Sequence, residues 1–162
     1  MSQVVSIRGA RRTYNEATVP VHALRGVDLD VRAGDFISLS GPSGSGKSTL
    51  LNLIGGLDRA DAGTVVVDGV DLSTLDESQL SDLRLDKIGF VFQSYNLLPV
   101  LTAEENVAFI MQLQGLAKAE RMARAREMLA AVGLADLAGR LPGDMSGGQQ
   151  QRVAIARAIA SR

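Results

Sequence analysis

The segment Gly41–Thr49 constrains the fold of this chain more than any other part of its sequence. It has the letters G-P-S-G-S-G-K-S-T and fits the phosphate-binding pattern G-x-x-x-x-G-K-[ST]. Glycine at Gly41, Gly44 and Gly46 lets the backbone curl so that successive N–H groups point at phosphate oxygens. Lys47 brings a positive charge to the β- and γ-phosphates, and the Ser48 hydroxyl is a ligand for Mg²⁺. We expect the other loop positions to line the same site: Pro42, Ser43, Ser45 and Thr49.

The residues on either side of this loop fit the same interpretation. Phe36–Leu39 is a short apolar run that predicts a buried strand, and Ser48–Leu57 predicts a helix. The N-terminus of that helix would face the phosphates. The alternative is a flexible Gly/Ser turn, but the order strand, loop and helix favours a site for a nucleoside triphosphate.

Bulk composition excludes several classes of protein. The chain has 162 residues, enough for one domain with a sizeable core, and its net charge is −1. Without a basic run, nucleic acid is not an expected partner. No stretch reaches the ~18 apolar residues of a membrane span, and the N-terminus lacks the apolar segment of a signal peptide. Any role at a membrane therefore requires a partner protein.

The first part of the chain predicts β-structure. Apolar and polar residues alternate through Val27–Arg32, as in a half-buried strand. Thr64–Val67 is β-branched and is followed by Asp68-Gly69, a signal for a tight turn before the next short strand. Ile88–Phe92 is a second apolar run that predicts a strand ending at Gln93.

Beyond Gln93 the apolar period becomes helical. Thr102 and Glu105 form a capping-box pattern that predicts a helix ending near Leu113. Lys118–Val132 predicts a second helix with one apolar face, closed by Gly133. A third predicted helix begins near Ser146 and runs to the end of the chain.

This third helix opens with a second motif, Met145-Ser146-Gly147-Gly148-Gln149. The serine can cap the helix, the two glycines permit close approach of the backbone, and the helix N-terminus offers N–H groups to an anion. Taken alone, S-G-G-Q is also compatible with an ordinary capped turn. Combined with the upstream phosphate loop, it predicts a second phosphate-recognising element.

With both motifs in place, the sequence resembles the ATP-binding-cassette (ABC) ATPases, whose signature is L-S-G-G-Q, here with methionine first. The resemblance covers residues 4–162. Within this family, the sequence is most similar to the lipoprotein-release, macrolide-export and cell-division branch. It implies an α/β fold: a RecA-like P-loop NTPase core with an antiparallel β-subdomain and an inserted helical subdomain. The implied division is 1–93 for the β-subdomain and core, 94–145 for the helical subdomain and 146–162 for the signature helix.

The resemblance also implies roles for individual residues. Gln93 stands where the family has a glutamine that contacts Mg²⁺ and the attacking water, and Tyr14 where it has an aromatic side chain that stacks on adenine. Residue by residue, each could also be an ordinary surface or strand-end position. Ser146–Gln149 would cap ATP bound to Gly41–Thr49 of a second copy, in a head-to-tail homodimer. The segment after Gln93 would face a membrane permease, so the implied location is the cytoplasmic face of the cell membrane.

Other features of the family have no match in residues 1–162. Related proteins carry, after the signature helix, a Walker B strand ending in Asp-Glu, a D-loop and a switch histidine. Val65–Asp68 precedes the helices and predicts a hairpin instead, while His22 lies upstream of the phosphate loop and is predicted to be a surface residue. We therefore expect a chain that is incomplete at its C-terminus relative to the family, binds ATP at most and is inactive alone.

Other functions compete with the transporter ATPase. The chain could be a non-catalytic fragment or an interaction module, which tight ATP binding without turnover would favour. A soluble ABC ATPase of DNA repair or translation would need a coiled-coil insertion, zinc-binding cysteines or a basic linker, and the chain has no cysteine. A kinase or GTPase would leave S-G-G-Q unexplained. The transported substrate does not follow from the sequence.

Overall fold

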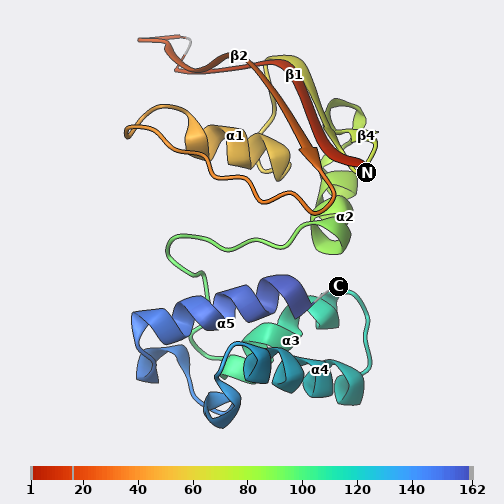
Figure 1. Ribbon diagram of the computed structural model, residues 1–162, viewed down its shortest axis with the longest axis vertical. Helices are drawn as coiled ribbons and strands as arrows, with labels where there is room; N and C mark the ends of the chain where they lie inside the picture. Colours follow the sequence, from red (N-terminus) through yellow and green to blue (C-terminus); the bar gives the residue numbers. More distant parts are fainter. Residues whose placement is uncertain (1, 16, 161–162) are drawn as a thin grey trace. The chain divides into compact units, whose positions relative to one another are not determined.

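The computed structural model describes residues 2–15 and 17–160. The chain divides into two compact units, residues 1–84 and residues 85–162. Each unit is described separately below, with the element labels of Figure 1. The predicted signature helix extends to residue 162, so its last two positions lie outside the described residues.

The first unit is built on an antiparallel sheet. Its strands are β1 (Gln3–Tyr14), β2 (Val21–Arg32), β3 (Ala62–Val67) and β4 (Val70–Asp71), in the order β2-β1-β3-β4. The predicted strands within Val27–Arg32 and Thr64–Val67 are therefore confirmed. The turn between β3 and β4 is also confirmed, because Asp68 and Gly69 both take positive φ, as a tight hairpin turn requires.

Two helices complete this unit. Helix α1 (Lys47–Ile54) packs against β2 and β3 and confirms the helix predicted after the phosphate loop. Its end comes earlier than predicted because two glycines follow, and Gly56 has φ 61°. Helix α2 (Glu77–Lys87), which follows the short 3₁₀ turn Leu72–Thr74 and extends past residue 84, where this unit ends, was not predicted from the sequence. The buried apolar side chains of this unit come from the sheet, both helices and the 3₁₀ turn: Val5, Ile7, Ala10, Leu24, Leu50, Leu53, Val65, Val67, Leu72 and Leu80.

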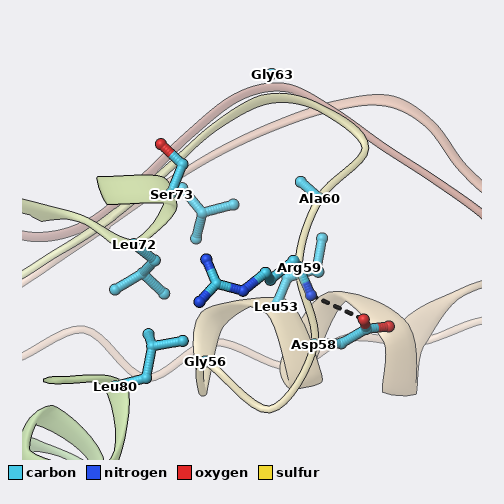
Figure 2. A pocket seen from close by; sticks show the side chains of 10 residues that line it. Leu53, Gly56, Asp58, Arg59, Ala60, Gly63, Leu72, Ser73 and Leu80 are labelled. Carbon is cyan, nitrogen blue, oxygen red and sulfur yellow. Dashed lines mark hydrogen bonds between the residues drawn. The ribbon is translucent and has the colours of Figure 1, made fainter. Parts of the chain in front are cut away.

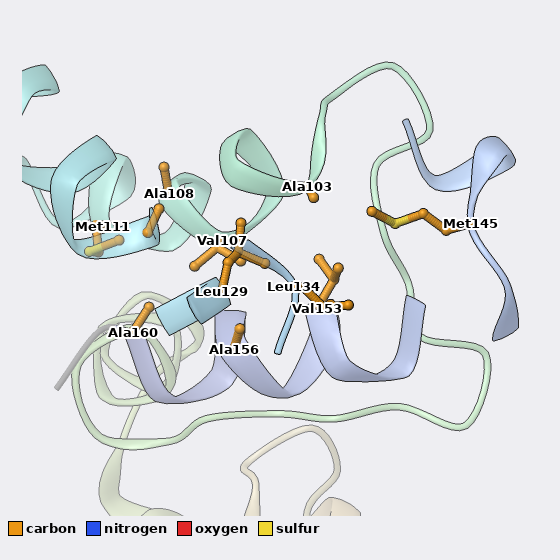
Figure 3. Packing of buried hydrophobic residues seen from close by; sticks show 11 residues of the cluster. Ala103, Val107, Ala108, Met111, Leu129, Leu134, Met145, Val153, Ala156 and Ala160 are labelled. Atoms are coloured by element: carbon orange, nitrogen blue, oxygen red, sulfur yellow. The ribbon is translucent and has the colours of Figure 1, made fainter. Parts of the chain in front are cut away.

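The second unit is a helical bundle of α3 (Ala103–Leu113), α4 (Lys118–Ala131) and α5 (Gly147–Ala160). Each helix packs against the other two, and short 3₁₀ turns at Ala135–Leu137 and Pro142–Asp144 join α4 to α5. Figure 3 shows the core between the helices, made of small and medium apolar side chains. All three helices were predicted, as were the capping box at Thr102 and the positive-φ glycine at Gly133.

The predicted strand at Phe36–Leu39 is wrong for this structure. These residues form no regular element, and the Phe36 side chain is 99% exposed. A strand exists only where a neighbour accepts and donates its ladder hydrogen bonds. The described sheet consists of β1 to β4, and residues 36–39 pair with none of them.

The predicted strand at Ile88–Phe92 is wrong for a related reason. This run is irregular and packs against α5, since a Cβ at Gly89 would overlap the carbonyl of Ala158. Phe90 and Phe92 stack on each other with ring centroids 5.5 Å apart. Their apolar surface is thus partly covered without strand pairing.

Candidate functional site

The phosphate loop has a backbone that glycine alone adopts easily. Gly41, Gly44 and Gly46 have φ of 149°, 80° and 89°, all in the region that disfavours side chains. A Cβ at Gly46 would overlap the carbonyl oxygen of Ala23, so β2 passes directly against the loop. The motif glycines are thus required both by the curl of the loop and by close packing against the sheet.

Lys47 lies with its ammonium inside the curl of this loop. Its Nζ donates hydrogen bonds to the carbonyl oxygens of Gly41 at 2.8 Å and Pro42 at 2.7 Å, and to Ser45 Oγ at 3.2 Å. The loop therefore holds a positive charge at its centre. Phosphate oxygens are better acceptors for this ammonium than neutral carbonyls.

The first turn of α1 completes the predicted phosphate site. It contains no acidic side chain, so no carboxylate competes with a bound anion at the positive end of the helix dipole. Ser48 is exposed in this turn, and its hydroxyl is a hard oxygen ligand of the kind that Mg²⁺ prefers. Among the described residues, no cluster of His, Cys, Asp and Glu could itself hold a metal ion. In this unit Ser48 is the predicted Mg²⁺ ligand, while the other predicted ligand, Gln93, belongs to residues 85–162.

A hollow of about 380 Å³ lies beside the loop. Its walls include Gly44 and Ser45 from the loop and His22 and Arg25 from β2. His22 is exposed, as predicted, and its Nδ1 lies 3.1 Å from Thr13 Oγ1. Sequence reasoning missed Arg25, because only the packing of β2 against the loop brings this cation to the site.

Tyr14 ends β1, opposite Val21 in the register with β2. Its hydroxyl donates to Asp58 Oδ2 at 2.7 Å, and the Arg12 guanidinium lies 4.8 Å from the centre of its ring. Arg12 also pairs with Asp58 at 2.8 Å and with Asp61 at 2.6 Å. Arg12, Tyr14, Asp58 and Asp61 are called the Arg12 cluster below. The cluster gave no signal in the sequence, because at least 44 residues separate its first two members from its last two.

The charges of the Arg12 cluster support one another. Burial alone would raise the pKa of Asp58, but hydrogen bonds from Tyr14, the Arg59 backbone and Arg12 together lower it below its ordinary value. The pKa of Asp61 is lowered chiefly by the Thr13 backbone N–H. The pKa of Arg12 is raised, chiefly by its hydrogen bond to Asp61. The ionised form of the cluster is therefore the stable one at neutral pH.

A cavity of about 240 Å³ is lined in part by Asp58 and Arg59. Figure 2 shows Arg59 among the apolar side chains of Leu53, Leu72 and Leu80, with the Arg59 backbone N–H bonded to Asp58. The Arg59 guanidinium donates to the Leu75 carbonyl at 2.8 Å. Apolar side chains and an Arg59 that is bound to the protein backbone line this cavity, and none of the residues Gly41–Thr49 lines it.

The signature motif forms the N-terminus of α5. Ser146 Oγ accepts from the Gln149 backbone N–H at 3.3 Å, and Gln149 Oε1 accepts from the Ser146 backbone N–H at 2.8 Å. This reciprocal pair is a capping box. Met145 is buried in the helical core, which explains why an apolar residue is needed there. Gly147 and Gly148 are exposed, so backbone N–H groups of the first turn are accessible.

Gln93 is exposed and begins a segment with an unusual backbone. Tyr95 and Asn96 both have positive φ, at 61° and 47°, although neither is glycine. Arg157 of α5 donates to their carbonyl oxygens at 2.8 Å and 2.7 Å. Burial lowers the pKa of Arg157. The signature helix therefore fixes the conformation of the segment that follows Gln93.

The predicted site residues fall into two groups. Tyr14 and Gly41–Thr49 lie in the first unit, where β2 connects them. Gln93 and Ser146–Gln149 lie in the second, connected through Arg157 and α5. The assignment of Ser48 and Gln93 to one Mg²⁺ stays a prediction, as do the roles of the other site residues.

Known proteins resemble this chain over nearly its whole length. The family described as "ABC transporter" matches residues 24–162. The chain is 49% identical to an uncharacterized ABC transporter ATP-binding protein of Thermotoga maritima, over 99% of this chain and 69% of that protein. It is 48% identical to the lipoprotein-releasing system ATP-binding protein LolD 2 of Caulobacter vibrioides, over 98% of this chain and 70% of that one.

Longer proteins and solved structures give the same result. The chain is 47% identical to the macrolide export ATP-binding/permease protein MacB of Marinobacter nauticus, but spans only 24% of its length. A dimeric, post-hydrolysis structure of the ATP-binding cassette MJ0796 bound to ADP and Pi superposes with a TM-score of 0.91 at 45% identity. That match covers 97% of this chain and 69% of the other, and it confirms the predicted fold class.

None of the helices in the described part of the chain is both long and apolar enough to cross a membrane. The phosphate loop, the capped signature helix and the similarity to known cassettes agree with one another. This chain belongs to the ABC transporter family, as an ATP-binding domain.

Proposed function

We propose that this chain is the nucleotide-binding part of an ABC transporter and that it binds Mg²⁺-ATP at Gly41–Thr49. The observation that carries the proposal is the position of Lys47 inside a loop curled by three positive-φ glycines. In this role Lys47 neutralises the β- and γ-phosphates, loop N–H groups bind the phosphate oxygens and Tyr14 stacks on adenine. Ser48 and Gln93 are the ligands we propose for Mg²⁺.

The signature motif acts on ATP bound by a second copy. Its capped N-terminus and exposed glycines offer backbone N–H groups to the γ-phosphate, and the absence of acidic residues in the first turn suits an anion. Two such contacts, related by a two-fold axis, make a head-to-tail homodimer that closes on ATP. The dimeric state of the similar MJ0796 cassette supports this arrangement.

The partner we propose is a membrane permease on whose cytoplasmic face the cassette sits. MacB carries both functions in its name, ATP-binding and permease, and this chain spans 24% of such a protein, a share that we assign to its ATP-binding part. Macrolides and lipoproteins are the cargo named for the relatives, so export of an amphipathic substrate is the class we propose.

Titration calorimetry with Mg²⁺-ATP tests the central step. We expect Lys47→Ala to abolish tight binding, because it removes the cation from the loop. Lys118→Ala, on the exposed start of α4, is the matched control and should bind as the unmodified protein does. Equal affinities for Lys47→Ala and the unmodified protein would contradict the assignment of the loop.

Turnover is a separate measurement. Catalysis of phosphoryl transfer depends mostly on positioning of the reacting groups. Among the 162 residues, Gln93 is the one to which we assign a role in positioning the attacking water. We therefore expect the 162-residue polypeptide, assayed alone, to bind ATP without releasing phosphate above background. Phosphate release that depends on Lys47 would overturn this part of the proposal.

A further inference from the structure

We infer that Arg12, Asp58 and Asp61 position the Tyr14 ring for adenine and tie base recognition to the helix that follows the phosphate loop. This inference rests on the proposed function, because it concerns the same ATP site. The three residues are positioning residues: in this role they touch Tyr14 or one another and not the nucleotide.

The Tyr14 ring is held at two places. At its edge, the hydroxyl donates to Asp58 Oδ2 over 2.7 Å. On one face, the Arg12 guanidinium lies 4.8 Å from the ring centre, within the range of a cation–π contact. A ring fixed at its edge and on one face can still stack a base on the opposite face. Its rotation is already restricted before any base arrives.

Arg12 is itself fixed by two carboxylates. Its Nε and Nη2 bind the two oxygens of Asp58 at 3.0 Å and 2.8 Å, and its Nη1 binds Asp61 at 2.6 Å. Such a bidentate pair fixes the plane of the guanidinium as well as its position. Asp61 also accepts from the Thr13 backbone N–H at 2.6 Å, which anchors the strand next to Tyr14. These side chains are only partly exposed, at 24% for Arg12, 20% for Asp58 and 31% for Asp61.

The carboxylates lie in the loop that leaves α1. The backbone N–H groups of Leu57 and Asp58 both donate to the carbonyl of Asn52, in α1. Helix α1 begins with Lys47 of the phosphate loop. Contacts therefore run without interruption from the phosphate loop through α1 and Asp58 to Tyr14.

Strand pairing gives the backbone next to Tyr14 a second connection to the phosphate loop. Thr13 pairs with His22 and Tyr14 with Val21. His22 lines the hollow beside Gly44 and Ser45. Because successive side chains of a strand point to opposite faces, this pairing connects the backbone of Tyr14 to the loop, while its ring is held by Asp58 and Arg12.

A purely structural role for the cluster makes a different prediction from a positioning role. Loss of local structure would weaken every ligand of the loop to the same degree. Loss of positioning would weaken only ligands that carry a base, because a mobile side chain must be ordered on binding. Tripolyphosphate with Mg²⁺ is the probe without a base, and ATP with Mg²⁺ is the probe with one.

The experiment is a titration of both probes into the unmodified protein and into Arg12→Gln. We expect Arg12→Gln to weaken ATP binding roughly 3- to 10-fold, the effect of leaving one side chain to be ordered. Tripolyphosphate affinity should be unchanged. Arg8→Gln is the matched control, since Arg8 lies on the same strand in an exposed ion pair with Asp30 and should change neither affinity.

Two further variants keep the inference testable if Arg12→Gln does not fold. Asp61→Asn removes one partner of Arg12 at the edge of the cluster, and should give a smaller change in the same direction if Arg12→Gln does not fold. Tyr14→Ala should shift the ratio of the two affinities at least as far as Arg12→Gln. An unchanged ratio in Arg12→Gln or Tyr14→Ala overturns the inference while ATP binding by the unmodified protein persists. Failure of the unmodified protein to bind either probe overturns the proposed function as well.

Discussion

The two units of this chain are stabilised by different kinds of contact. In residues 85–162, three helices close on an apolar core, and the buried Asn106 uses its amide to hold the backbone of Leu98, Leu101 and Thr102. In residues 1–84, a sheet packs against α1 while charged side chains join distant segments, above all in the Arg12 cluster. Both units have an apolar core, and residues 1–84 add ion pairs that join distant segments of the chain.

The difference explains where sequence reasoning succeeded. A helix pairs its own backbone groups within a few residues, so capping and periodicity are visible locally. A strand pairs with a segment that can be anywhere in the chain. The three helices between residues 103 and 160 were thus predicted, whereas the apolar runs at 36–39 and 88–92 were assigned to strands that do not form.

Each unit carries one of the two tyrosines of the chain, and tryptophan is absent. Tyr14 reports on residues 1–84 and Tyr95 on residues 85–162. Variants with a single tyrosine, Tyr95→Phe or Tyr14→Phe, therefore allow unfolding of each unit to be followed by fluorescence in the same denaturant series.

The largest effect should come from the helical core. Leu129 is fully buried there, and Leu129→Ala should lower the free energy of unfolding reported by Tyr95 by about 2–5 kcal/mol. Leu113→Ala is the control, because its side chain is 55% exposed. The free energy of unfolding reported by Tyr14 should change less. Equal shifts at both tyrosines would mean that the two units unfold together and that their separate stabilisation is not observable.

The next effect concerns the phosphate loop. Gly46→Ala places a side chain at a positive-φ position, where it overlaps the Ala23 carbonyl. It should lower the free energy of unfolding reported by Tyr14 by about 1–3 kcal/mol and abolish ATP binding. Gly34→Ala is matched in φ, at 87°, but has open space around it. It should lose some stability and bind ATP normally. If Gly34→Ala also lost binding, the packing of the loop on β2 would not be the cause.

The two capping boxes of the helical unit provide a finer comparison. Thr102→Ala and Ser146→Ala should each cost about 1 kcal/mol at Tyr95, since each removes a helix cap. Only the second cap lies in the signature. Ser146→Arg should therefore block ATP-dependent dimerisation in gel filtration while leaving ATP binding by the monomer intact, and Thr102→Arg should dimerise normally. A Ser146→Arg protein that still dimerises with ATP would refute the role of the signature in the dimer.

The smallest effect is expected from acid. The folded-state pKa values of Asp58 and Asp61 lie below the ordinary 3.8, so their ionised forms stabilise the fold above pH 3.8. This contribution, roughly 0.2–1 kcal/mol per pair, is lost as pH falls through the lowered values. The midpoint of denaturant unfolding reported by Tyr14 fluorescence should therefore decrease below about pH 4. The double variant Asp58→Asn, Asp61→Asn should make this decrease smaller, with a remainder from Asp30, whose pKa is lowered by its hydrogen bond with Arg8. A decrease of unchanged size would place its origin outside the Arg12 cluster.

Local sequence determined much of this protein. The positions of Gly41, Gly44, Gly46 and Lys47 specified the phosphate loop, and S-G-G-Q specified a capped helix start, because both depend on backbone geometry within a few residues. The predicted helices after Gln93 followed from periodicity and caps for the same reason.

Only the tertiary structure decided the surroundings of these motifs. It brought Arg25 to the phosphate loop, gathered Arg12, Asp58 and Asp61 around Tyr14, and set Arg157 against the segment after Gln93. It also left residues 36–39 and 88–92 without strand partners. The residues that make these contacts are far apart in the chain, and whether a strand finds a partner also depends on distant segments. Local sequence patterns do not reveal interactions of this kind.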